Sequence, residues 1–231
     1  MWIDDEMLMR CHEDRALSVW VPEYPMVVLG SSNRVEEECL EEACLRDGIP
    51  LLKRYGGGGT VLLHPGCVVL SLGLWTEHPY RNDRYFSMIN QALAGCLLSR
   101  WPELEGIEER GISDLAIGGK KIAGTSLFRS RHYLLYQASV LVEPRAQLMG
   151  RYLAHPGREP EYRQGRSHED FVSGLSLYVP ALSPHMLCQE LEQHFMEHLQ
   201  EDEQSRLLCS QPSQWPHILR RAAQHSAFVS L

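Results

Sequence analysis

The order of apolar and polar residues along the chain predicts short strands joined by tight turns. Residues 26–29 form an apolar run rich in β-branched residues between Pro25 and Gly30. Similar runs recur along the chain, and turn-forming residues separate them. The further predicted strands cover residues 49–54, 60–63, 67–74, 113–117, 120–124 and 133–142.

Four segments are predicted to be helical. Residues 33–48 place apolar side chains on one face, and Gly48 is suited to end that helix. Residues 83–100 and 185–199 also repeat apolar residues at helical spacing. Residues 167–175 open with a pattern like a capping box, which predicts a short helix. The residues expected to face the core are Val35, Cys39, Leu40, Ala43, Cys44, Phe86, Ile89, Leu93, Cys96, Leu97, Leu187, Leu191, Phe195 and Leu199.

These elements favour an α+β fold. The helices cluster and do not alternate with the strands, which is typical of a mainly antiparallel β-sheet flanked by helices. The 231 residues show no repeat and no evident linker, so we expect a single domain over residues 1–231.

Composition narrows the class of protein. The net charge of −8 opposes nucleic-acid binding, and no apolar run reaches the roughly 20 residues of a membrane span. The first residues are acidic and amphipathic, unlike a secretory signal. The seven cysteines are scattered without a CxxC pattern, which predicts reduced thiols and a cytoplasmic location.

Charge is unevenly distributed along the chain. Residues 110–166 contain ten Lys and Arg against four Asp and Glu, whereas the remainder is acidic. This basic zone is either a site for an anionic ligand or acidic protein partner, or an ordinary solvated surface.

Four consecutive glycines, Gly56–Gly59, lie between two strand-like runs in the sequence KRYGGGGTVLLHPG. A flexible linker would have a run of Ser, Thr or Asn neighbours, whereas both flanks here are strand-like, so we expect a tight, fixed connection. Backbone N–H groups without side chains can cradle an anion, and Lys53, Arg54 and Thr60 add polar groups. The run matches neither a P-loop nor a dinucleotide-binding motif. Ligand contact and a purely structural turn both remain open from these residues alone.

A second segment, GISDLAIGGKKIAGTS at residues 111–126, predicts a β-hairpin that turns at Gly118-Gly119. Strand alternation sends Lys120 and Lys121 to opposite faces, so one of them can face a pocket. Two solvated lysines are the alternative.

Together the two segments resemble the paired signatures of the lipoate–protein ligase A family, in the biotin/lipoate ligase superfamily. KRYGGGGTV is similar to its arginine, Gly-Gly-Gly, Thr/Ala-Val signature. SDLAIGGKKIAGTS resembles its Ser/Asn-Asp-Leu and Gly-Arg-Lys-Ile/Val-Ser-Gly signature. The opening DDEMLM, VVLGSSNRVEEE and RQGRSHEDFV add weaker matches, and the resemblance covers roughly residues 1–180.

The resemblance implies a class II synthetase-like catalytic domain and a two-step reaction. ATP, with Mg²⁺, and lipoate or octanoate would give an acyl-adenylate, and the acyl group would then pass to a lysine of a lipoyl-carrier protein.

The resemblance also assigns the site. Lys121 matches the family's invariant catalytic lysine, which we interpret as an electrostatic clamp on developing negative charge and not as a base. Arg54 matches an arginine beside the acyl group, and Asp114 falls near the phosphates. The remaining expected substrate- and ATP-binding residues are Gly57, Gly58, Gly59, Thr60 and Gly124.

Several positions depart from the family pattern. Gly56 replaces a serine, Leu63 replaces a histidine with His64 one position late, and Ala123 replaces a serine. A His-Gly-Thr motif is replaced by the residues Gln137, Ala138 and Ser139.

Two rival functions stay open. An ATP-independent octanoyl or lipoyl transferase would need a nucleophilic cysteine, but the transferase signatures are absent and Cys67 is at neither known position. A family member that binds carrier domains without catalysis is the other rival.

Residues 181–231 are expected to form a C-terminal helical extension, too short for the accessory domain of many such ligases. A separate accessory polypeptide is one way to supply that part. The expected partner is an acidic lipoyl-carrier domain, with no nucleic acid and no membrane.

Overall fold

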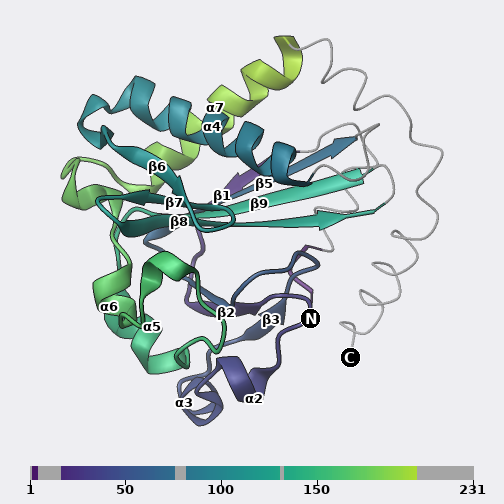
Figure 1. The fold of residues 1–231 in the computed structure, drawn as a ribbon, viewed down its shortest axis with the longest axis vertical. Helices are drawn as coiled ribbons and strands as arrows, with labels where there is room; N and C mark the ends of the chain where they lie inside the picture. The colour runs from purple at the N-terminus through teal and green to yellow at the C-terminus, as the bar shows by residue number, and fades with distance from the viewer. Residues whose placement is uncertain (1, 5–16, 76–81, 131–132, 202–231) are drawn as a thin grey trace.

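The computed structural model describes residues 2–4, 17–75, 82–130 and 133–201. Within these residues, two β-sheets lie against each other with helices on both outer sides (Figure 1). The expected α+β class with a mainly antiparallel sheet is confirmed.

The larger sheet has six antiparallel strands in the order β1-β5-β9-β8-β7-β6. Cross-strand pairs fix its register, for example Val69 with Ser139 and Ser139 with Gly124. The strands are β1 (Leu17–Trp20), β5 (Cys67–Trp75), β6 (Ile107–Arg110), β7 (Asp114–Ile117), β8 (Lys120–Arg129) and β9 (Tyr133–Leu141).

The smaller sheet has three strands in the order β3-β2-β4: β3 (Leu51–Lys53), β2 (Met26–Leu29) and β4 (Val61–Leu63). β2 pairs in parallel with β3 and antiparallel with β4. Side chains of β2 alternate, so Met26 and Val28 pack with Val69 of the larger sheet. Val27 and Leu29 pack with the helical residues on the opposite side. This alternation places the smaller sheet against the larger one.

Two long helices, α4 (Asn82–Arg100) and α7 (Pro184–Glu201), cover the other face of the larger sheet (Figure 1). Ile89, Leu93 and Leu97 of α4 and Leu187 and Leu191 of α7 are buried there, as expected from their spacing. The side chain of Leu199 lies outside the described residues.

The expected single helix over residues 33–48 is wrong. The structure has two short helices, α2 (Val35–Glu38) and α3 (Glu41–Arg46), because Cys39 leaves the helical path and pairs with Leu153. Leu40 is consequently exposed. Gly48 does end α3: its φ is +66°, and its N–H and that of Ile49 bond back to the last turn.

Three elements were not expected: β1, β6 and α5 (Ala146–Tyr152). The short helix α6 (His168–Phe171) is confirmed, with Ser167 accepting a hydrogen bond from the Asp170 N–H. Short 3₁₀ turns complete the structure: η2 (Pro102–Leu104), η3 (Glu161–Arg163) and η4 (Leu175–Leu177).

Candidate functional site

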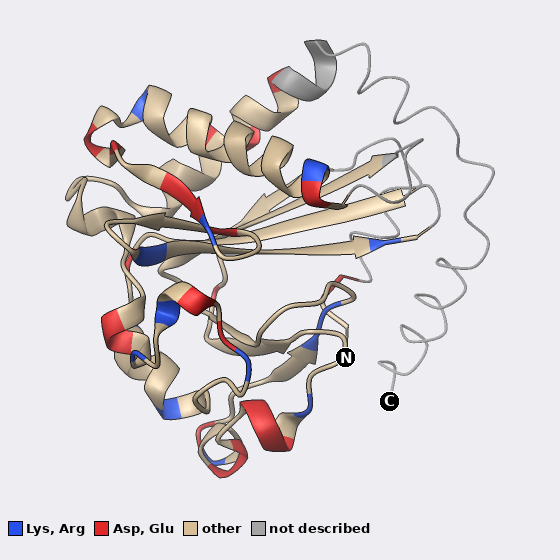
Figure 2. Cartoon of the chain, in the orientation of Figure 1, with Lys and Arg blue, Asp and Glu red and all other residues tan. Residues whose placement is uncertain are grey.

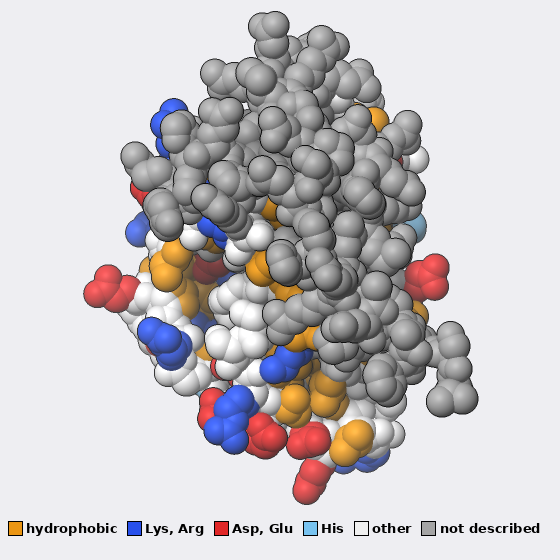
Figure 3. Space-filling model, turned by 90° about the vertical axis from the view of Figure 1, so that its right-hand side faces the viewer, with side chains coloured by type: hydrophobic (Ala, Val, Ile, Leu, Met, Phe, Trp, Pro, Cys, Tyr) orange, Lys and Arg blue, Asp and Glu red, His pale blue; other side chains and the backbone are white. Residues whose placement is uncertain are grey.

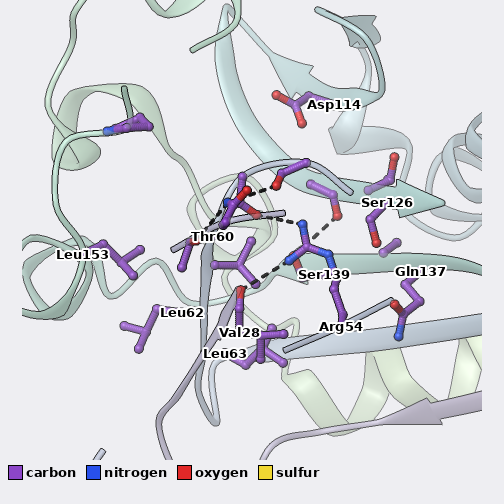
Figure 4. A pocket seen from close by; sticks show the side chains of 18 of the residues that line it. Val28, Arg54, Thr60, Leu62, Leu63, Asp114, Ser126, Gln137, Ser139 and Leu153 are labelled. Carbon is purple, nitrogen blue, oxygen red and sulfur yellow. Dashed lines mark hydrogen bonds between the residues drawn. The ribbon is translucent and has the colours of Figure 1, made fainter. Parts of the chain in front are cut away.

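A large cleft of about 1950 Å³ lies between the two sheets and extends to residues 154–172. Glycines of the loop after β3, the β7–β8 hairpin and the exposed face of the larger sheet all contribute to its lining. Figure 4 shows Arg54, Thr60 and Asp114 around this space. The two segments singled out in the sequence therefore meet at one cleft.

Arg54 fixes the conformation of the glycine loop, residues 56–60. Its Nη2 donates hydrogen bonds of 2.7 Å to the carbonyl oxygens of Gly57 and Gly59, and Nη1 donates to Val28 O at 3.3 Å (Figure 4). The side chain is only 6% exposed. Burial lowers the pKa of Arg54 to about 10, while the charges of Asp4 and Glu38 oppose that shift, so the guanidinium stays charged at neutral pH.

The glycines of the loop are needed at their positions for different reasons. Gly58 has φ +91°, a conformation that favours glycine, and a Cβ on Gly56 would lie 2.8 Å from the Ser126 hydroxyl. A Cβ on Gly57 or Gly59 would meet no atom of the described residues within 4 Å. Packing within that part of the chain therefore does not explain these two glycines. Gly59 lines the cleft, where close approach of a ligand would explain it, whereas Gly57 is not among the described lining residues.

Asn33, which follows β2 and also lines the cleft, is hydrogen-bonded to the loop. Its amide Nδ2 donates to Gly58 O and to Thr60 Oγ1, both at 3.2 Å. Asn33 was not expected at the site, although it lies in the VVLGSSNRVEEE match.

Lys121 reaches the same cleft from the β7–β8 hairpin. Gly118 and Gly119 have φ of +57° and +73°, which favours the expected two-residue turn. Lys120 is exposed and Lys121 lines the cleft, so alternation separates them as expected. Lys121 Nζ lies 2.8 Å from Asp114 Oδ1.

The lack of a side chain at Gly124 leaves the space that the Lys121 ammonium group occupies. A Cβ on Gly124 would lie 2.8 Å from both Nζ and Cε of Lys121. Any larger residue at this position would displace the ammonium group.

The floor of the cleft becomes apolar away from Lys121. Gly124, Ser139, Val69 and Trp20 are neighbours on adjacent strands, so they form one row across the sheet. The row ends in an apolar cluster with the smaller sheet: Met26, Val28, Leu63 and Val69, with Trp20, Leu52 and Val61 packed against them. A slot of this kind suits an acyl chain whose polar end lies near Lys121.

Asp4 is a buried carboxylate at this site that the sequence analysis did not assign. It is 1% exposed and accepts hydrogen bonds from the Tyr55 N–H at 2.7 Å and Gln137 Nε2 at 2.8 Å. Its only sequence signal was the weak match at the start of the chain. Gln137, one of the departures, therefore has a defined partner.

The other departures occupy different places. Leu63 lines the cleft and Ala123 is fully buried in β8. His64 is fully buried and is not among the described cleft-lining residues. Its Nδ1 accepts a hydrogen bond from the Gly66 N–H, and burial, with the nearby Arg145 charge, lowers its pKa to about 4. The neutral ring fills the core and does not replace a cleft histidine.

No cysteine is among the described residues that line the cleft. Cys67 is fully buried, and burial raises its pKa to about 12, so it is protonated and inaccessible at neutral pH. Cys39, Cys44 and Cys96 are also buried free thiols. Cys11 and Cys209 lie outside the described residues.

The basic zone of residues 110–166 does not form one uninterrupted basic surface. Arg110, Lys121 and Arg163 are each within 4 Å of a carboxylate, as are Arg145 and Arg151. Figure 2 shows basic and acidic residues interspersed, and Figure 3 shows both at the edge of an apolar area on one face. The charge excess is therefore partly compensated in space.

Within the described residues, no group of three or more His, Cys, Asp or Glu side chains gathers as a metal site. Nor does that part of the chain contain a helix with the length and hydrophobicity to cross a membrane.

Comparison with known proteins gives one family match. The family model described as lipoyl protein ligase A/B catalytic domain matches residues 2–200. Two curated relatives are similar: an inactive lipoate–protein ligase 2 of Plasmodium falciparum (21% identity, 73% of this chain) and a lipoate-protein ligase A of Blochmanniella floridana (22%, 79%). The chain spans about half the length of these relatives, 52% and 53% respectively.

Solved structures share the fold. A lipoate-protein ligase A bound with ATP has a TM-score of 0.67 at 20% identity, covering 90% of this chain and 89% of that one. A bipartite lipoate protein ligase of Thermoplasma acidophilum, studied with its E2 lipoyl domain, has a TM-score of 0.65 at 20% identity, covering 95% and 94%. At such identity the likeness establishes the fold alone.

Proposed function

Because the chain belongs to the lipoyl protein ligase A/B catalytic-domain family, we propose that it is an ATP-dependent lipoate–protein ligase. In the first step, a carboxylate oxygen of lipoate or octanoate attacks the α-phosphorus of ATP, and pyrophosphate leaves. In the second, the amine of a carrier lysine attacks the acyl carbon, loses a proton, and AMP leaves. The product is an amide-linked lipoyl group.

The observation that carries this proposal is the convergence of two distant segments on one cleft. The glycine loop and Lys121 are about 60 residues apart in sequence, yet both line it. An acyl-adenylate needs an apolar slot beside an anion site, and the cleft offers both.

Lys121 is the proposed catalytic residue. Negative charge develops on acyl and phosphoryl oxygens as the mixed anhydride forms and breaks. A fixed ammonium in a cleft stabilises that charge better than water does. No protein nucleophile is required, because the carrier lysine attacks and positioning supplies much of the rate.

The glycine loop is proposed to contact the adenylate with its backbone. Gly57, Gly58 and Gly59 lie beside Thr60, whose hydroxyl accepts from Asn33. Arg54 then acts as the support of the loop, since its hydrogen bonds go to loop and strand carbonyl oxygens. Arg54 also lines the cleft, where the resemblance expects it to lie beside the acyl group.

Mg²⁺ would enter as the ATP complex. Magnesium commonly takes substrate phosphates and waters as most of its ligands, with one or two carboxylates. Asp114 lines the cleft and is the carboxylate that the resemblance places near the phosphates, but Lys121 and Tyr162 already occupy its two oxygens. The residues present therefore do not form a built metal site, and we derive no step through the ion.

A lipoyl-carrier domain is the proposed acceptor of the acyl group. The proposal also includes an acidic surface on that carrier and a separate accessory subunit. The support is the family itself, because the paired charges of residues 110–166 do not by themselves favour an acidic partner.

The test is lipoate-dependent exchange of labelled pyrophosphate into ATP. We expect exchange with lipoate or octanoate, a loss of about 100-fold or more in Lys121→Ala, and little change in the matched Lys120→Ala variant. Transfer of label to an apo lipoyl domain tests the second step.

Other outcomes would support the rivals. Acyl transfer from a carrier without ATP would contradict the ligase proposal. Binding of a carrier with neither reaction would support a non-catalytic member, a possibility that the inactive Plasmodium falciparum relative makes concrete.

A further inference from the structure

Asp114 connects Lys121 to a residue outside the cleft. Asp114 Oδ1 pairs with Lys121 Nζ at 2.8 Å, and Asp114 Oδ2 accepts a hydrogen bond from Tyr162 Oη at 2.9 Å. The Asp114 and Lys121 side chains are 13% and 24% exposed, so this chain of contacts is largely shielded from water. Tyr162 is not among the described residues that line the cleft.

Tyr162 belongs to η3, in a segment (residues 160–166) that the larger sheet does not include. Its ring lies 5.1 Å from the ring of Phe171, and a Cβ on Gly111 would come within 3.5 Å of it. The phenol therefore reaches Asp114 from a ring that packs against Phe171 and lies close to the Gly111 backbone.

The segment is also tied directly to the hairpin that carries Lys121. Arg166 Nη2 donates to Gly119 O at 3.0 Å and to Tyr162 O at 2.6 Å. The turn between these residues is unusual, because Gln164 has φ +54° and Gly165 has φ +70°. A non-glycine residue in this conformation persists only where surrounding contacts hold it. Segment 160–166 is thus built to a fixed shape against the hairpin.

We propose that Tyr162 is a positioning residue for Lys121, acting through Asp114. This inference rests on the proposed function for its role in catalysis. The phenol hydrogen bond holds the Asp114 carboxylate in one orientation, so that only one oxygen faces the lysine. The ammonium is then fixed over Gly124 at the point where the acyl and phosphoryl oxygens would lie.

The phenol is suited to donate and not to accept. Burial, followed by the charge of Asp114, raises the pKa of Tyr162, so the hydroxyl keeps its proton. Because Asp114 accepts this hydrogen bond, its negative charge is shared between Tyr162 and Lys121. The carboxylate therefore neutralises less of the Lys121 charge, which stays available to a bound anion.

A purely structural role for Tyr162 is the alternative, and lysine labelling separates the two without any enzyme assay. The chain has only three lysines, Lys53, Lys120 and Lys121. Trace acylation followed by mass spectrometry therefore measures the reactivity of Lys121 relative to Lys120 on the same hairpin. We expect the ratio to rise about 5-fold in Tyr162→Phe, since a mobile carboxylate protects the amine less well.

Tyr152→Phe is the matched control, because Tyr152 donates an equivalent hydrogen bond to Asp47, with its oxygens 3.1 Å apart, away from the cleft. The ratio should stay unchanged there. An unchanged ratio in Tyr162→Phe, or an equal rise in Tyr152→Phe, would overturn the inference. Absence of lipoate-dependent exchange in the unaltered protein would instead count against the proposed function and leave the labelling result intact.

Kinetics provide the second readout. In Tyr162→Phe we expect kcat for adenylate formation to fall about 10-fold with KM for lipoate nearly unchanged. In an Asp114→Asn background the same substitution should add almost nothing, because its path to Lys121 is already broken. Additive losses would show that Tyr162 acts independently of Asp114 and would contradict the proposal.

Discussion

On the glycine-loop side of the cleft, one buried arginine hydrogen-bonds to carbonyl oxygens and fixes the backbone. On the Lys121 side, the functional group is a side chain, and it is held by other side chains: Asp114 and, behind it, Tyr162. The first side presents rigid backbone to a ligand. The second presents a charge whose position depends on a chain of contacts. Loss of one side chain should therefore cost folding stability on the first side and catalysis on the second.

Equivalent substitutions on the two sides provide the largest expected contrast. Arg54→Met removes the hydrogen bonds to Val28, Gly57 and Gly59, and should lower the free energy of unfolding by about 3 kcal/mol. Lys121→Met should lower it by less, about 1–2 kcal/mol, since Asp114 keeps its hydrogen bond from Tyr162, yet reduce pyrophosphate exchange by about 100-fold. Urea denaturation and exchange assays measure the two effects.

The contrast would fail if both variants lost stability equally. In that case Lys121 would be as much a part of the fold as Arg54 is. Arg54→Lys is a useful intermediate, because a lysine cannot bond to two carbonyl oxygens with one planar group.

A pH titration tests the core behind the glycine loop. The pKa of His64 is lowered from 6.5 to about 4 by burial, so the folded state holds this ring neutral while the unfolded chain takes up a proton near pH 6.5. The stabilisation that comes from keeping His64 neutral is fully present above pH 6.5 and is lost as pH falls toward 4. Between pH 6.5 and pH 5 the free energy of unfolding should fall by about 1.5 kcal/mol on this account.

His64→Asn keeps an acceptor for the Gly66 N–H and does not titrate, so its stability should depend less on pH over that interval. His185→Asn, which removes an exposed imidazole that does not act on either buried ring, is the matched control. On the Lys121 side, burial and the charges of Arg163 and His155 lower the pKa of His168 to about 4 in the same way. An unchanged slope in His64→Asn would mean that other groups dominate acid sensitivity.

A chain-length assay tests whether the two sides share one acyl slot. With strands about 4.8 Å apart, Trp20 lies about 14 Å from Gly124 along the row Gly124, Ser139, Val69, Trp20. An extended eight-carbon acyl chain is about 9 Å long and would end near Val69, with Trp20 closing the slot. Trp20→Ala should raise activation of dodecanoate relative to octanoate by about 10-fold.

An unchanged chain-length preference would place the acyl chain elsewhere in the cleft. Ser139→Ala, in the same row but small in both forms, is the matched control.

The parts of the fold that could be predicted from the sequence are those determined by residues close together in the chain. Alternation along β2, the Gly118-Gly119 turn and the apolar faces of α4 and α7 each follow from neighbouring residues. The 33–48 helix was wrong because its interruption depends on pairing of Cys39 with Leu153, more than 100 residues away. β6 was missed because its sequence, Ile107–Arg110, is mostly charged and lies at the edge of the sheet.

The site divides in the same way. Gly58, Thr60, Asp114, Lys121 and Gly124 were predicted because they belong to two compact motifs, and each of them lines the cleft. Asp4, Asn33 and Tyr162 were not, since each reaches the site through a tertiary hydrogen bond that no local pattern records. Arg54 was found but its contacts were not foreseen: it supports the loop through backbone carbonyl oxygens.

Two glycines of the loop give the smallest and most selective test of the comparison. Gly58→Ala forces an alanine into φ +91° and brings its Cβ to 3.3 Å from Arg54 Nη2, so the free energy of unfolding should fall by about 1 kcal/mol. Gly59 lines the cleft, and the Cβ of Gly59→Ala would meet no atom of the described residues within 4 Å, so its stability should be unchanged or slightly higher. If the loop backbone contacts the adenylate, however, the added methyl group should block that contact. The KM for ATP should then rise about 5-fold, the effect expected for loss of one hydrogen bond. Gly59→Ala with full stability and unaltered KM would mean that the ligand does not reach this loop, and that the glycine-loop side serves the fold alone.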